Sequence, residues 1–100
     1  MAEAVELSKI KKAVVEHFGL RDLAMTSHRR SRHIARPRQI AMTLASEFTP
    51  LTLTAIGRHF GNRDHTTVRH AILMVQSLCL SDPAFNAEVQ HLRDRLEALP

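Results

Sequence analysis

The fold is decided by residues 53–78, which read "LTAIGRHFGNRDHTTVRHAILMVQSL". Two helix-compatible segments, 53–60 and 64–78, flank the turn "GNR", whose glycine and asparagine accept a left-handed backbone. A short helix, a glycine-containing turn and a second helix together make a helix-turn-helix unit. The second helix begins with polar residues, so its first turn is expected to face outward, toward a ligand.

The second segment gathers its apolar residues on one side of a helix. At roughly 100° per residue, an arc of about 120° holds Val68, Ala71, Ile72, Val75, Leu78 and Cys79. The stripe that faces outward comprises Thr66, Arg69, His70, Leu73 and Ser77. The helix is therefore expected to pack through its back and to expose its front.

Polar side chains fill the start of this helix. His65 and Thr66 have the hydrogen-bonding groups needed to contact base edges in a DNA major groove. Asp64 is either an N-cap or an acceptor from a cytosine amino group, and capping alone is favoured. Thr67 could bind a phosphate together with the helix N-terminus. Simple exposure would be the better explanation of an isolated threonine pair, but the capped turn, the outward stripe and the basic segment together favour contact with DNA.

The rest of the chain predicts further helices and no strand. Helices are expected over about 5–18, 37–48 and 83–99, with one more helical turn over 20–25. Pro37 is placed in a first turn, where proline is tolerated. The prediction is one all-α domain of five or six helices over residues 1–100, with the helix-turn-helix at about 53–80.

Composition limits the possible classes. One hundred residues with 44% hydrophobic content make one modest core. The sequence has no run of eighteen apolar residues and no signal-like N-terminus, so we expect a cytoplasmic protein without a membrane partner.

A basic segment precedes the helix-turn-helix. No acidic residue occurs from Leu23 to Ser46, and the net charge of the chain is +4. Five arginines stand within ten residues, at Arg29, Arg30, Arg32, Arg36 and Arg38. We expect an exposed basic loop at about 26–35 that binds a polyanion, with a merely solvated loop as the alternative.

Three stretches together carry a family resemblance. "GNRDHTTVRHA", preceded by "RRSRHIARPRQIAMTLASEFT" and "LTAIGRHFG", resembles the C-terminal DNA-binding domain (domain IV) of the bacterial replication initiator DnaA. The resemblance covers roughly residues 8–99. It implies an all-α fold similar to that of the Trp repressor. It also implies binding, as a monomer, to short asymmetric double-stranded DNA boxes at replication origins or promoters.

The resemblance also implies which residues contact DNA. The minor-groove arginine of the family matches Arg30, and its major-groove contacts match Asp64, His65 and Thr66. Its phosphate contacts match Arg38, Gln39, Thr67 and His70. We also expect phosphate contacts from Arg29, Arg32, Leu53, Thr54 and Arg69. Two departures weaken the pattern, since Ser46 replaces a common lysine and Thr54 a common proline.

The chain lacks the phosphate-binding pattern G-x-x-x-x-G-K-[ST]. We therefore expect no ATP, no other cofactor, no bound metal and no catalysis. The sequence fits an excised domain of a longer initiator and a stand-alone protein equally well.

Two other functions are alternatives to DNA binding. A metal-dependent nuclease would use His59, His65, His70 and Asp64, but His65 and His70 are separated by roughly 140° around a helix. A DnaA-like protein-interaction module would regulate replication without specific DNA binding. It would dock on a replication protein through Leu73 or the final helix.

Overall fold

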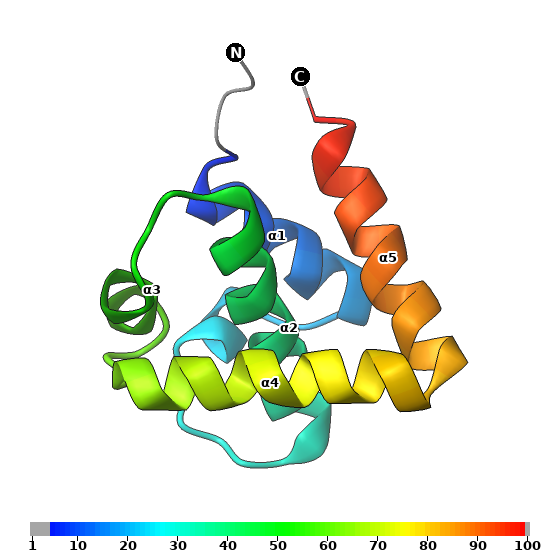
Figure 1. The fold of residues 1–100 in the computed structure, drawn as a ribbon. Helices are drawn as coiled ribbons and strands as arrows, with labels where there is room; N and C mark the ends of the chain where they lie inside the picture. Colours follow the sequence, from blue (N-terminus) through cyan, green and yellow to red (C-terminus); the bar gives the residue numbers. More distant parts are fainter. Residues whose placement is uncertain (1–4, 100) are drawn as a thin grey trace.

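Figure 1 shows a computed structural model in which residues 5–99 are described. Its elements are α1 (Leu7–Phe18), the 3-10 helix η1 (Asp22–Met25), α2 (Arg32–Phe48), α3 (Leu53–His59), α4 (His65–Ser81) and α5 (Pro83–Glu97). The described residues contain no strand, which confirms the all-α prediction. None of their helices has the length and apolar character needed to cross a bilayer.

Local signals mark the end of α1 and the starts of α3 and α5 where the sequence predicts them. Gly19 closes α1 with a φ of 65°. The Thr52 hydroxyl accepts a hydrogen bond from the Ala55 N–H at 3.1 Å and so caps α3. Asp82 caps α5 by accepting from the N–H groups of Ala84 and Phe85 at 3.1 and 3.2 Å. Each cap satisfies backbone groups that the helix itself leaves without a partner.

The start of α2 differs from the prediction. The helix begins at Arg32, five residues before Pro37, so the basic loop comprises residues 26–31 rather than 26–35. A proline inside a helix removes one hydrogen bond. The turn ahead of it is nevertheless held, because the Ser31 carbonyl accepts from Ile34 and Ala35 at 3.0 and 2.8 Å, and Ile34 packs against the core.

The core lies where α2 passes between the other helices (Figure 1). Its largest fully buried side chains include Ile10, Ile40, Leu44, Ile56, Phe60, Val68, Val75, Leu92 and Leu96. The apolar stripe of the final helix, Val89, Leu92 and Leu96, is buried, as expected for a core face. It is therefore not available as a docking surface.

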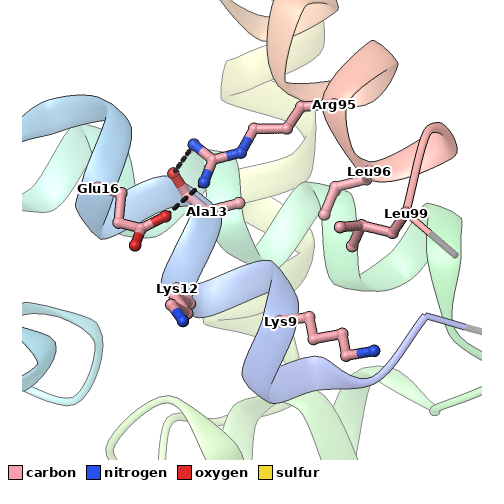
Figure 2. Close-up of a pocket in the computed structure, with 7 residues that line it drawn as sticks. All are labelled: Lys9, Lys12, Ala13, Glu16, Arg95, Leu96 and Leu99. Carbon is pink, nitrogen blue, oxygen red and sulfur yellow. Dashed lines mark hydrogen bonds and ion pairs between the residues drawn. The ribbon is translucent and has the colours of Figure 1, made fainter.

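Two arginines of α5 attach this helix to the rest of the molecule. Arg95 donates to the Glu16 carboxylate and, at 3.5 Å, to the Ala13 carbonyl of α1 (Figure 2). Arg93 donates to both carboxylate oxygens of Glu47 in α2, at 2.8 and 2.9 Å. Paired donors of this kind fix direction as well as distance.

Helix α3 closely approaches the turn before α4 at Gly57. A Cβ atom there would lie 2.0 Å from the Arg63 carbonyl oxygen, and the Arg63 N–H donates to the Gly57 carbonyl at 2.8 Å. The turn between the helices uses left-handed backbone at Gly61 (φ 81°) and Asn62 (φ 57°), as the sequence predicts. Glycine at position 57 thus allows the two helices to meet.

We expect Gly57→Ala to lower the free energy of unfolding by about 3 kcal/mol, because the new methyl group overlaps backbone that cannot move aside easily. Gly19→Ala is the matched control. A Cβ at Gly19 meets nothing within 4 Å, so only left-handed strain of about 1–2 kcal/mol opposes it. Urea unfolding followed by circular dichroism measures both, and equal costs would contradict the close approach.

Candidate nucleic-acid interface

Helix α4 presents its polar first turn to solvent. Val68, Ala71 and Val75 are buried, and Ile72, Leu78 and Cys79 are half-buried. The predicted outward residues are all exposed: Thr66, Arg69, His70, Leu73 and Ser77. The orientation deduced from helical spacing is confirmed.

The three residues expected to contact bases in the major groove lie together, with Asp64 in contact with both Thr66 and His65. Thr66 donates through its hydroxyl to one carboxylate oxygen of Asp64 at 3.0 Å. The other oxygen of Asp64 lies 2.8 Å from Nδ1 of His65. The Thr66 hydrogen bond holds the pKa of Asp64 below its ordinary value. All three side chains are exposed, so a DNA molecule could reach them.

This arrangement corrects the capping prediction for Asp64. Its backbone stands at the N-cap position, and its carbonyl accepts from the Val68 N–H at 3.2 Å. Its side chain, however, makes no capping hydrogen bond. The carboxylate is turned toward the neighbouring hydroxyl and imidazole instead, and both of these groups point outward.

A groove runs between α2 and α4 and is bordered by the basic loop, which passes below α4 in Figure 1. We call it the α2/α4 groove. Its lining comprises His28, Arg29, Arg30, Ala35, Arg38, Gln39, Met42, Arg63, Thr67, His70, Ala71 and Met74. This lining contains four arginines and two histidines and no acidic residue, so its field favours an anion.

The α2/α4 groove brings together six of the predicted DNA contacts. These are Arg29, Arg30, Arg38, Gln39, Thr67 and His70, which come from three separate elements. Seven others lie outside the lining: Arg32, Leu53, Thr54, Asp64, His65, Thr66 and Arg69. Of these only Leu53 is half-buried, and the rest are exposed. The predicted contacts thus form two sets, one lining a groove that suits an anion and the other largely exposed outside it.

Arg38 has an internal role that its sequence position does not indicate. It is 4% exposed, and it donates to the Arg29 carbonyl at 2.8 and 3.3 Å and to the Ala24 carbonyl at 3.3 Å. Burial, and next the charge of Arg63, lower its pKa to about 10, so it stays protonated at neutral pH. Its phosphate contact remains a prediction.

Sequence reasoning missed Arg63. The residue lies in the helix-turn-helix turn, and its guanidinium donates to the carbonyl oxygens of Phe60 and, at 2.6 Å, of Ser27 in the basic loop. The available signal was its position next to a left-handed glycine turn, where a long side chain can fold back over the turn.

The metal-binding alternative finds no geometric support in the described part of the chain. Among residues 5–99, no three His, Cys, Asp or Glu side chains are grouped so as to hold an ion. His59, His65 and His70 are each exposed.

Comparison with known proteins gives one consistent result. Residues 7–75 match the family described as "Bacterial dnaA protein helix-turn-helix". The chain is 48% identical over 93 residues to the chromosomal replication initiator protein DnaA of Gluconobacter oxydans, a match that covers 93% of this chain and 19% of that protein. The corresponding protein of Sphingopyxis alaskensis is 44% identical over 94% of this chain and 21% of its own length. The chain therefore spans about a fifth of these relatives.

Replacing Thr66 with valine should raise the pKa of Asp64 toward its ordinary value, because the hydroxyl that stabilises the carboxylate is lost while the side-chain shape is kept. An NMR titration of the Asp64 carboxyl carbon measures the change. Thr67→Val is the control, since Thr67 makes no hydrogen bond to Asp64. An unchanged Asp64 titration in Thr66→Val would contradict the observed hydrogen bond.

Proposed function

The chain belongs to the family of the bacterial DnaA helix-turn-helix domain, and on this basis we propose that it binds double-stranded DNA at short, DnaA-box-like sites. The observation that carries the proposal is the acid-free α2/α4 groove beside the exposed first turn of α4. A phosphate backbone needs clustered cations, and base edges need exposed polar side chains next to them. Both are found on one side of this molecule.

We assign base contacts in the major groove to Asp64, His65 and Thr66. These residues open α4, whose buried back anchors it against α2 and α3. A helix in the major groove presents its N-terminal residues to base edges. The threonine hydroxyl can exchange its hydrogen bond with Asp64, and the imidazole nitrogen its contact with Asp64, for hydrogen bonds with a base.

We assign the adjoining minor groove to Arg30 in the basic loop. Arg30 is exposed and lines the α2/α4 groove next to the α4 face. A narrow A·T minor groove has an enhanced negative potential that attracts arginine. Phosphate contacts follow from the remaining predicted residues: Arg29, Arg32, Arg38, Gln39, Leu53, Thr54, Thr67, Arg69 and His70.

The proposal covers binding alone. The sequence contains no ATP-binding loop, and we assign it no catalysis. We place its action on chromosomal DNA in the bacterial cytoplasm, with one molecule on each asymmetric box.

One observation favours the protein-interaction alternative. Leu73 and Met74 of α4 are 51% and 45% exposed, and Leu80 is 90% exposed. Exposed apolar side chains on one helix suit contact with another protein. This alternative predicts a domain that does not bind DNA specifically, and the following experiment separates the two.

Fluorescence anisotropy should show tighter binding to a DnaA-type box than to a scrambled duplex of the same composition. Affinity should fall steeply with salt, because each phosphate contact releases about one counterion. Equal affinities for the two duplexes would contradict sequence-specific binding. Absence of binding even at low salt would favour protein docking.

Two variants should distinguish the major-groove contacts from the minor-groove contact. Thr66→Ala should lose about 1–3 kcal/mol of discrimination at the major-groove positions only.

The role of Arg30 is tested by changing the duplex. Base pairs at its minor-groove end are changed from A·T to G·C or to inosine·C, which resembles G·C in the major groove but lacks the 2-amino group in the minor groove. Wild type should reject G·C and accept inosine·C, whereas Arg30→Gln should treat both alike. Ser77→Ala, at the far end of the outward stripe, is the control for both.

A further inference from the structure

Two arginines hold the backbone of the basic loop. Arg63, in the turn before α4, donates to the Ser27 carbonyl at 2.6 Å, and Arg38, in α2, donates twice to the Arg29 carbonyl at 2.8 and 3.3 Å. The two carbonyls flank His28, directly before Arg30. The loop is therefore attached both to α2 and to the turn of the helix-turn-helix.

Arg63 connects two parts of the proposed DNA surface. It is bonded to Asp64, the first residue assigned to the major groove, and its guanidinium contacts Ser27, three residues before Arg30. The same guanidinium also donates to the Phe60 carbonyl within its own turn, so it is held by two carbonyl oxygens at once. The chain separation between Arg63 and Ser27 is 36 residues, so this link does not arise from local sequence.

The close packing around this link limits its movement. A Cβ at Gly61 would lie 2.4 Å from the Thr26 carbonyl and 2.7 Å from a terminal nitrogen of Arg63. The helix-turn-helix turn and the first residue of the basic loop are thus in direct contact. Arg63 fills the space beside this contact, and its donors form a planar fork that suits two separate carbonyls.

We propose that Arg63 is a positioning residue that sets the distance between Arg30 and the first turn of α4, and hence the spacing between the two grooves that the protein contacts. The inference rests on the proposed function. Successive base pairs lie about 3.4 Å apart along the duplex. A loop held at two carbonyls cannot shift by that distance, so the intact link selects boxes with one fixed spacing.

The test measures anisotropy of wild type and Arg63→Gln with four duplexes. These are a DnaA-type box, the box with G·C at the minor-groove end, the box with a changed major-groove position, and the box with one base pair inserted between the two ends. Wild type should bind each altered duplex at least about tenfold more weakly. Arg63→Gln should lose most of the penalty for G·C and for the insertion, while the major-groove penalty stays.

Two further variants separate position from charge. Arg63→Lys keeps the charge but replaces the planar fork with a single ammonium group, so it should behave like Arg63→Gln. Lys12→Gln removes one charge from α1, in the groove between α1 and α5 (Figure 2), and should keep every penalty. If Arg63→Gln does not fold, as judged by thermal melting, Arg63→Lys decides the outcome with the same duplexes.

The outcomes distinguish the positioning role of Arg63 from the proposed DNA binding on which it rests. If wild type does not prefer the box to a scrambled duplex, the proposed function fails. If wild type shows all the penalties and both Arg63 variants keep them, or lose them equally in both grooves, the positioning role is overturned while DNA binding stands.

Discussion

The contact between Gly57 of α3 and Arg63 in the turn before α4 is the constraint on which the rest of the structure depends. The Arg63 carbonyl occupies the space that any larger side chain at Gly57 would need. Because this contact fixes where the chain enters α4, it fixes the direction of the exposed first turn. It also brings the Arg63 side chain to the Ser27 carbonyl. The arrangement of the basic loop, the α2/α4 groove and the start of α4 therefore follows from one absent Cβ atom.

Helix positions could be predicted because their signals are local. The caps at Thr52 and Asp82 and the left-handed Gly19 involve residues within a few positions of one another. The predicted start of α2 is wrong because the interaction that sets it is not local. The turn before Pro37 is stabilised by the packing of Ile34 on a core that other helices supply. No pattern within the basic segment contains that information.

The candidate site was predictable in part for the same reason. Helical spacing identified the outward face of α4, and the absence of acids identified the basic loop. Side-chain partners were not predictable, since the closely spaced arginines look alike in sequence. Arg30 is exposed and Arg38 is 4% exposed, and the difference comes from carbonyls at Ala24 and Arg29. The DNA contacts themselves remain predictions.

The contacts of Asp64 with Thr66 and His65 have a consequence for the base selectivity of the proposed DNA complex. A protein rejects a wrong partner strongly when the mismatch leaves buried polar groups without hydrogen bonds. Here Thr66 and Asp64 already share a hydrogen bond in the free protein, and His65 lies 2.8 Å from the other oxygen of Asp64. In the proposed complex, they can return to this internal arrangement at a wrong base, which recovers part of the interaction energy lost there. Discrimination at any one base pair is thereby limited, and the accuracy of the proposed complex depends on the sum over several base pairs along the duplex.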